Sequence, residues 1–238
     1  MIKLFGFGPE FGVLDPSPFV IKIDIFMRMA GIQFEAVSGF GNIKNSPKGK
    51  LPYIDDGGKI VADSFFIQKY LEETYKVSLD AHLSEEQKAT AHLIIKCLEG
   101  DFYWCMVRSR WMHEESWAMV KEAFFGSMPF PLKTLVPPIA RRSVKKALLA
   151  QGMGKHSDEE MKEIAKDTLE SLSVLLSDKE YFFGAQPTTL DVTAYAFLAE
   201  FILSDFKNPL TELAKSYDNL VAYCERVNAK YYGADSMG

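Results

Sequence analysis

The stretch 46–54, Ser-Pro-Lys-Gly-Lys-Leu-Pro-Tyr-Ile, constrains the fold of this chain more than any other. Its proline, Pro52, lies inside a strand-like apolar run, where it cannot donate to a sheet ladder. Such a proline indicates an exposed strand edge or a tight cis turn. Asp63-Ser64 follows shortly after and opens an apolar helix, whose first N–H groups are free to bind a carboxylate. We therefore expect an unpaired strand edge beside an anion-binding helix start.

Residues 1–76 alternate between strand and helix patterns. Ser17-Pro18 is a strong helix start and Gly31 a helix end, while Asp56-Gly57-Gly58 is typical of a hairpin turn. The expected strands are 2–7, 33–37, 51–54 and 59–62, and the expected helices are 18–30 and 64–76. This order predicts a thioredoxin-like α/β domain over residues 1–76.

After a polar linker at 77–85, only helical periods remain. Three capping-box pairs mark helix starts in this half: Ser84 with Gln87, Ser157 with Glu160, and Thr188 with Asp191. The prolines and glycines of 126–156 indicate an irregular segment. The fold class is therefore α/β followed by all-α, with an all-helical domain over residues 86–238.

Composition excludes several functional classes. The net charge of −5 argues against a nucleic-acid partner, and three scattered cysteines are too few for a disulfide framework. The four histidines lack the spacing of metal ligands, so no metal is expected. Gly6 and Gly8 interrupt the first apolar run and no stretch is long enough to span a bilayer. We therefore expect a cytoplasmic protein without a signal peptide or a transmembrane segment.

The whole chain resembles the cytosolic glutathione transferase superfamily. Lys50-Leu51-Pro52 is similar to the strand that ends in the family's cis-proline, and Asp63-Ser64 is similar to the family's acid-Ser motif. Thr188 and Asp191, following Gly184, match the capping box of the family's core helix. Within the superfamily the chain most resembles the Fax and metaxin-related branch, through the segments 6–19, 110–111 and 152–157.

The resemblance implies a glutathione-binding site and a function. Glutathione would be the co-substrate, with the Leu51 backbone pairing with its cysteinyl part next to Pro52. Asp63 and Ser64 would hold the γ-glutamyl group, and Lys50 a glutathione carboxylate. For Lys50 a solvated lysine, and for Asp63 and Ser64 simple helix capping, remain alternatives. The partners implied are glutathione and a small hydrophobic electrophile, in a homodimer.

Ser17 is the candidate catalytic residue. Ser17 to Val20 occupies the place where thioredoxin relatives carry C-x-x-C, and the absence of a thiol there excludes dithiol exchange. A hydroxyl at a helix N-terminus would stabilise the thiolate of bound glutathione. A serine before proline is equally a preferred N-cap with no further role. Both interpretations stay open at this point.

The electrophile is expected to contact side chains of the helical domain. We predict that Phe19, Tyr103, Arg108 and Trp111 shape its binding site; the alternative for the two aromatic residues of the helix, Tyr103 and Trp111, is a place in the core. The basic run 141–146 is expected to be a solvated helix face, with contact to an anionic membrane as the alternative.

The leading functional prediction is a glutathione S-transferase that conjugates the glutathione thiol to a small electrophile. The alternative is a non-catalytic, Fax/metaxin-like binding protein that retains the fold. A disulfide oxidoreductase is disfavoured, because the active-site cysteine is missing.

Overall fold

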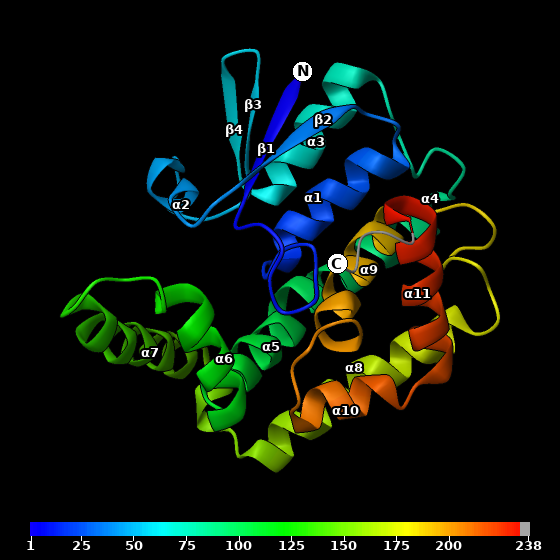
Figure 1. Ribbon diagram of the computed structural model, residues 1–238. Helices are drawn as coiled ribbons and strands as arrows, with labels where there is room; N and C mark the ends of the chain where they lie inside the picture. The colour runs from blue at the N-terminus through cyan, green and yellow to red at the C-terminus, as the bar shows by residue number, and fades with distance from the viewer. Residues whose placement is uncertain (234–238) are drawn as a thin grey trace.

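The computed structural model describes residues 1–233 and shows an α/β part beside a helical part (Figure 1). The first part comprises β1 (Ile2–Gly6), α1 (Pro18–Met29), β2 (Phe34–Ser38), α2 (Asn42–Asn45), β3 (Tyr53–Asp56), β4 (Lys59–Ala62) and α3 (Ser64–Tyr75). The predicted fold class is confirmed by this arrangement. The domain limits at 76 and 86 stay a prediction, although α3 ends and α4 begins near them.

The four strands form one mixed sheet in the order β2-β1-β3-β4. β1 runs parallel to β2 and antiparallel to β3, so Leu4 lies opposite both Ala36 and Ile54. β3 begins at Tyr53 rather than at the predicted residue 51, because Pro52 has no N–H to offer the ladder. The predicted hairpin turn is present between β3 and β4, with positive φ at Gly57 and Gly58.

The helical part begins directly after the linker. It comprises α4 (Glu85–Cys97), a π-helical turn (Leu98–Phe102), α5 (Tyr103–Trp111), α6 (Glu114–Phe125), α7 (Leu132–Gln151), a 3-10 turn (Met153–Lys155), α8 (Asp158–Leu176), α9 (Thr189–Ile202), α10 (Pro209–Lys215) and α11 (Asp218–Tyr232). Within residues 1–233, no helix combines the length and the apolar character that crossing a bilayer requires.

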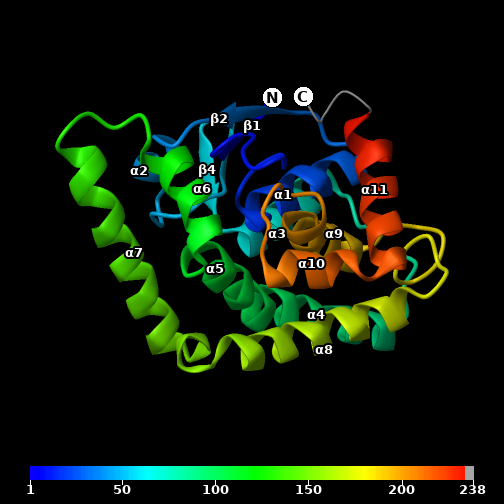
Figure 2. The ribbon, with the colours of Figure 1, turned by 60° about the horizontal axis from the view of Figure 1, so that its bottom comes forward.

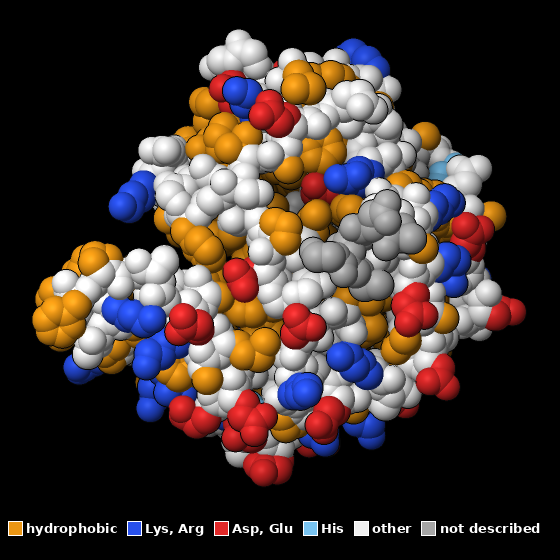
Figure 3. Space-filling view, viewed as in Figure 1, with side chains coloured by type: hydrophobic (Ala, Val, Ile, Leu, Met, Phe, Trp, Pro, Cys, Tyr) orange, Lys and Arg blue, Asp and Glu red, His pale blue; other side chains and the backbone are white. Residues whose placement is uncertain are grey.

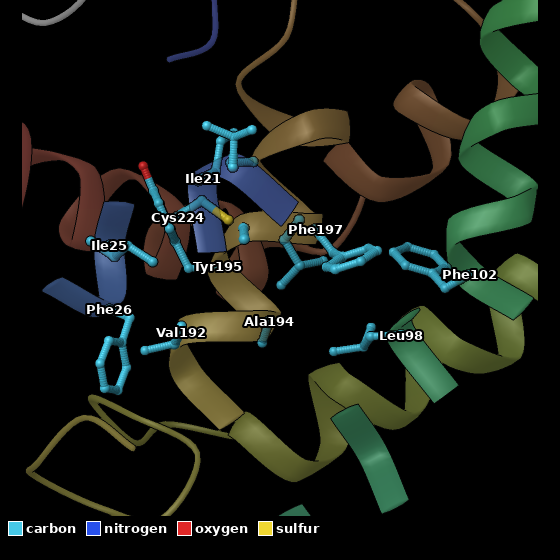
Figure 4. Close-up of a cluster of buried hydrophobic side chains, with 14 of the residues drawn as sticks. Ile21, Ile25, Phe26, Leu98, Phe102, Val192, Ala194, Tyr195, Phe197 and Cys224 are labelled. Atoms are coloured by element: carbon cyan, nitrogen blue, oxygen red, sulfur yellow. The ribbon is translucent and has the colours of Figure 1, made fainter. Parts of the chain in front are cut away.

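Helix α9 joins the two parts. Every residue of α9 is buried, and the helix packs against α1, α4, α10 and α11. In Figure 4, Ile21, Ile25 and Phe26 of α1 lie on one side of α9, and Leu98 and Phe102 on another. The capping box predicted at its start is present: the Asp191 carboxylate accepts from both the N–H and the hydroxyl of Thr188. The same core therefore holds the α/β part in place against the helical part.

The prediction of an irregular segment over 126–156 is wrong for most of its length. Residues 132–151 form the long helix α7, which extends away from the body beside α6 (Figure 2). Pro137 and Pro138 lie inside this helix and remove two N–H donors. Because proline fixes φ near the helical value, the helix continues past both of them. These two prolines therefore belong to a helix and not to a loop.

Candidate functional site

Two adjoining pockets lie where α1, the approach to β3 and the start of α3 meet the helical part. The small pocket, about 140 Å³, is lined by Phe19, Lys48, Lys50, Leu51, Pro52, Asp63 and Ser64. The interdomain pocket, about 460 Å³, extends from it towards α5 and α6. Phe19, Lys50 and Leu51 line both pockets. A ligand in the small pocket can therefore present one end to the interdomain pocket.

The backbone of Leu51 is open at the mouth of the small pocket. The Leu51–Pro52 peptide bond is cis, and the sheet ladder starts only at Tyr53. Neither the N–H nor the C=O of Leu51 makes a hydrogen bond to any residue of the described chain. The next carbonyl, that of Pro52, accepts from the N–H of Asp63 at 3.4 Å. An extended peptide can pair with one such open backbone residue through two hydrogen bonds.

The start of α3 supplies the second wall of the small pocket. Asp63 is its N-cap residue: the side chain accepts from the N–H of Phe65 at 3.1 Å, while the backbone takes a φ of 83°. Ser64 is the first helical residue and is buried, and within residues 1–233 its hydroxyl makes no hydrogen bond. The helix start thus offers a hydroxyl and a positive helix end to an anion.

Ser17 lies at the start of α1 and lines the interdomain pocket. Its carbonyl accepts from the N–H groups of Val20 and Ile21, as an N-cap carbonyl does. Its hydroxyl caps no helix N–H and has no partner among the described residues. The capping interpretation therefore holds for the backbone of Ser17 and not for its side chain, which is free to face a ligand.

Asp15 holds the loop that carries Ser17. Its buried carboxylate accepts from the N–H groups of Phe7 (2.7 Å), Gly8 (2.9 Å) and Ser17 (2.9 Å). Burial raises the pKa of Asp15 to about 8, against the opposing effect of the Gly8 and Ser17 N–H groups. Through these three hydrogen bonds the Asp15 side chain ties the end of β1 to the start of α1.

We expect Asp15 to make stability depend on pH. Between its ordinary pKa of 3.8 and about 8, the native state holds one proton more than the unfolded state. The free energy of unfolding therefore falls as pH rises, by up to about 1.4 kcal/mol per pH unit from this group. Urea unfolding at pH 5 and pH 7.5 should show a smaller decline for Asp15→Asn than for the unmodified chain. Equal declines in the two proteins would contradict this role for Asp15.

The buried ion pair of Arg110 and Glu200 also holds the loop before α1. Arg110 donates to the carbonyl of Pro16 at 3.0 Å and to the Glu200 carboxylate at 2.6 Å. Both side chains are buried, and the guanidinium also lies 4.6 Å from the ring centre of Phe206. Burial raises the pKa of Glu200, and the charge of Arg110 opposes that rise. The pair therefore links α5 and α9 to the residue next to Ser17.

The wall of the interdomain pocket is largely aromatic. Tyr103 and Trp111 both line it, so their predicted contact with an electrophile stays a prediction about this pocket; the centre of the Tyr103 ring lies 5.1 Å from that of Phe19, edge-on. Phe124 of α6 completes the wall: the centre of its ring lies 5.9 Å from that of Phe7 and 6.3 Å from that of Trp111. Burial raises the pKa of Tyr103, so this phenol keeps its proton. The pocket therefore combines an aromatic wall with the polar side chains of Ser17 and Tyr103.

The expected place of Arg108 in this wall is wrong. Its guanidinium donates to the carbonyls of Met153 (3.0 Å) and His156 (2.7 Å) and pairs with Asp158 at 2.8 Å. Arg108 lies five residues after Tyr103, which turns it about 140° around the helix from that residue. The helix period instead puts Val107, Arg110 and Trp111 on the pocket side.

Several pocket residues were not singled out from the sequence. Arg110 and Val107 follow from the helix period once Tyr103 is placed. Lys48, Glu99 and Trp104 lie within a few residues of predicted ones, whereas Phe7, Phe11, Ile43 and Phe124 come from other segments that the fold brings to the pocket. Among residues 1–233, no group of three or more His, Cys, Asp and Glu side chains is arranged to hold a metal ion.

Two family models match the chain. The model described as "Glutathione S-transferase N-terminal domain" matches residues 18–116, and "Glutathione S-transferase, C-terminal domain" matches residues 165–227. Among solved structures, the beta-etherase LigF from Sphingobium sp. strain SYK-6 covers 99% of this chain and 98% of its own, with a TM-score of 0.65 and 19% identity. A Methylobacterium radiotolerans glutathione S-transferase in complex with glutathione sulfonate gives a TM-score of 0.60 and 16% identity, over 99% and 94% of the two chains. These structures share the fold.

Three curated relatives differ in kind. Isoprene-epoxide–glutathione S-transferase of Rhodococcus sp. (strain AD45) is 31% identical over 97% of this chain and 99% of its own. Failed axon connections of Drosophila melanogaster is also 31% identical, over 91% of this chain, which spans 54% of the fly protein. Metaxin-2 of Homo sapiens is 27% identical, over 89% of this chain and 81% of its own.

Proposed function

Because the chain belongs to the glutathione S-transferase family, we propose that it binds glutathione in the small pocket and transfers the thiol to an electrophile in the interdomain pocket. The observation that carries the proposal is the open backbone of Leu51 at the junction of the two pockets. When the cysteinyl residue of glutathione pairs with the Leu51 backbone, its side chain lies at the interdomain pocket, which Ser17 also lines.

The charges of the small pocket match the ends of glutathione. The cysteinyl backbone pairs with Leu51, and the γ-glutamyl carboxylate lies at the start of α3, where the Ser64 hydroxyl donates to it. Asp63 balances the γ-glutamyl ammonium. Lys48 and Lys50, which also line the small pocket, would meet the glycine carboxylate. In this assignment Asp63 and the two lysines meet ends of opposite charge, while the γ-glutamyl carboxylate meets the Ser64 hydroxyl and the positive end of α3.

Ser17 activates the thiol by stabilising its ionised form. A free cysteine thiol has a pKa of about 8.5, so only a few per cent is thiolate at pH 7. The Ser17 hydroxyl, which has no described hydrogen-bond partner, donates to the thiolate, and the positive end of α1 adds to the effect. The larger thiolate fraction raises the rate of attack on the electrophile.

The class of electrophile we propose is a small epoxide, because the Rhodococcus relative is named for an epoxide substrate. The thiolate sulfur attacks a ring carbon, the S–C bond forms and the C–O bond breaks, and the electron pair passes to the oxygen. The Tyr103 phenol, which keeps its proton, donates it or a hydrogen bond to that oxygen. The aromatic wall of Phe7, Trp111 and Phe124 surrounds the apolar part of the substrate.

Replacing Tyr103 by Phe separates the two kinds of electrophile. Opening an epoxide leaves an oxyanion that needs a proton, whereas chloride leaves chloro-dinitrobenzene unassisted. We expect kcat for an alkyl epoxide to fall about 100-fold in Tyr103→Phe, and turnover of chloro-dinitrobenzene to change less than about threefold. Steady-state kinetics with both substrates measure the difference. Equal losses on the two substrates would remove the proton-donor role of Tyr103.

The proposal as a whole is tested by glutathione itself. About ten millimolar glutathione should raise the melting temperature of the chain, since a ligand that binds only the folded state stabilises it. Ophthalmic acid, which lacks the thiol but keeps the peptide, should stabilise it as well. No stabilisation by either peptide, together with no turnover of chloro-dinitrobenzene or of an epoxide, would overturn the proposal.

A second candidate function is a non-catalytic binding protein. It is favoured by the similarity to Failed axon connections and Metaxin-2, whose names carry no transferase activity. Glutathione stabilisation without turnover of any electrophile would favour it. Within this candidate, contact of the basic run 141–146 with an anionic membrane stays a prediction. Binding of the chain to anionic lipid vesicles, and its loss when Arg142 and Lys146 are neutralised, tests it. Arg141 is unsuitable for that test, because it already binds Glu114 and the carbonyls of Trp111 and Met112.

We also propose that the protein is cytoplasmic and forms a homodimer. Fractionation of the cells that make it tests the location, and analytical sedimentation of the purified chain tests the oligomeric state.

A further inference from the structure

A third pocket, the α7 pocket, lies on the opposite face of α5. Its volume is about 680 Å³ and it is bounded by α5, the start of α6, α7, α8 and α10. Arg108, Ser109 and Met112 of α5 line it, while Tyr103, Val107 and Trp111 face the interdomain pocket. The α7 pocket shares no lining residue with either pocket of the candidate site. Figure 2 shows α7 and α8 meeting at an angle.

The α7 pocket carries unpaired positive charge. Two of its arginines are already engaged: Arg108 with Asp158, and Arg141 with Glu114. Those two carboxylates are the acidic side chains of the lining. Three further cations of the lining have no ion-pair partner in the part of the chain that the structure describes: Arg142, Lys145 and Lys162. Figure 3 shows Lys and Arg side chains gathered on α7.

The floor of the α7 pocket is apolar. Leu148, Met161 and Leu210 are buried there, from α7, α8 and α10 respectively. His113 also belongs to the lining, and its buried Nδ1 has no hydrogen-bond partner among the described residues. A buried polar atom without a partner is costly. The pocket itself combines an apolar base with a cationic rim.

We propose that the α7 pocket binds an amphipathic phosphate monoester, with the apolar chain on the floor and the phosphate among Arg142, Lys145 and Lys162. A phosphate monoester carries a charge of about −1.5 to −2 at pH 7, which three free cations balance better than they do a monoanionic carboxylate. The volume lies within the usual range of about 300–1,000 Å³ for small-molecule sites. This site is separate from the proposed glutathione site.

The binding of dodecyl phosphate, below its micelle concentration, tests the site by titration calorimetry of the full chain. We expect saturable binding of one molecule, unchanged by saturating glutathione. Lys145→Gln with Lys162→Gln should weaken binding about tenfold, the effect of removing two exposed charge pairs. The matched control is Lys146→Gln with Lys166→Gln, which removes the same charge from exposed neighbours on the same two helices, outside the pocket lining. The control should bind dodecyl phosphate as the unmodified chain does.

Two further probes separate the contributions of chain and phosphate. Dodecanol and inorganic phosphate should each bind at least about tenfold more weakly than dodecyl phosphate, because each lacks one half of the contacts. If the chain co-sediments with phosphatidic acid vesicles and the pocket variant co-sediments less, the ligand is a membrane lipid. If the chain binds monomeric dodecyl phosphate but not the vesicles, the ligand is a soluble metabolite.

The proposal is overturned by any of three results. These are no saturable binding of dodecyl phosphate, equal loss of affinity in the pocket variant and in its matched control, or equal affinity for dodecyl phosphate and dodecanol. The exposed lysines leave the fold intact, since surface substitutions usually change the free energy of unfolding by less than about 0.5 kcal/mol. Loss of binding in the pocket variant is therefore read as loss of the site.

Discussion

The Ser17→Ala variant is expected to lose about 10- to 100-fold of kcat/KM towards chloro-dinitrobenzene near pH 6.5. A hydrogen bond to a charged group contributes about 1.5–3 kcal/mol, so removing the hydroxyl raises the pKa of the bound thiol by about 1–2 units. The loss should shrink as pH rises, because the thiol then ionises without help. Stopped-flow absorbance at 240 nm, where the thiolate absorbs, follows the bound thiol directly.

Ser17→Thr is the matched control, because it keeps the hydroxyl at the start of α1. We expect it to retain most of the activity, and both variants to keep the thermal stabilisation by glutathione. The backbone cap is unchanged in both, since the cap at this position is made by the Ser17 carbonyl. A Ser17→Ala variant with unchanged turnover and an unchanged pH profile would remove Ser17 from the mechanism while leaving glutathione binding in place.

Removal of Arg110 should produce the largest change in stability. Arg110→Met leaves the Glu200 carboxylate buried without its partner, which costs about 3–5 kcal/mol of the free energy of unfolding. For a chain of this size the melting temperature should fall by about 10 °C. The carbonyl of Pro16 loses its donor as well, so the loop that carries Ser17 is held less firmly. Urea unfolding and turnover measure the two effects.

The double variant Arg110→Met with Glu200→Leu separates charge from packing. Replacing both partners of a buried ion pair by apolar residues is often neutral or stabilising. We therefore expect the double variant to recover most of the stability that Arg110→Met loses, without recovering activity, because the Pro16 carbonyl still lacks its donor. Equal destabilisation of the single and double variants would show that packing of the Arg110 side chain against Phe206, rather than charge, is what matters.

The sequence was most informative where local chemistry decides the backbone. Pro52, the Asp-Gly-Gly turn and the three capping boxes each act within a few residues, and the structure has them where the pattern predicted. The small pocket followed for the same reason, since the residues before Pro52 and those at the start of α3 are joined by one short hairpin. Lys48 is the residue of this pocket that the sequence did not single out.

Prediction failed where distant segments decide. Arg108 was expected in the wall of the wrong pocket, because the order of polar and aromatic residues along a helix does not say which face meets a neighbour. The helix α7 was missed because its two prolines look the same in a loop and in a helix that tolerates them. The role of Asp15 as the acceptor of three N–H groups depends on a loop conformation that no short motif specifies.

The backbone amide shifts of the chain on titration with glutathione test the central claim most directly. The account predicts saturable shifts of the Leu51 and Ser64 amides, since the peptide would accept a hydrogen bond from the first and place its carboxylate at the second. The amide shifts of residues whose side chains line the α7 pocket, such as Lys145 and Lys162, should stay unchanged. Saturable binding that leaves Leu51 and Ser64 unchanged would contradict the claim that this open strand edge and helix start hold glutathione.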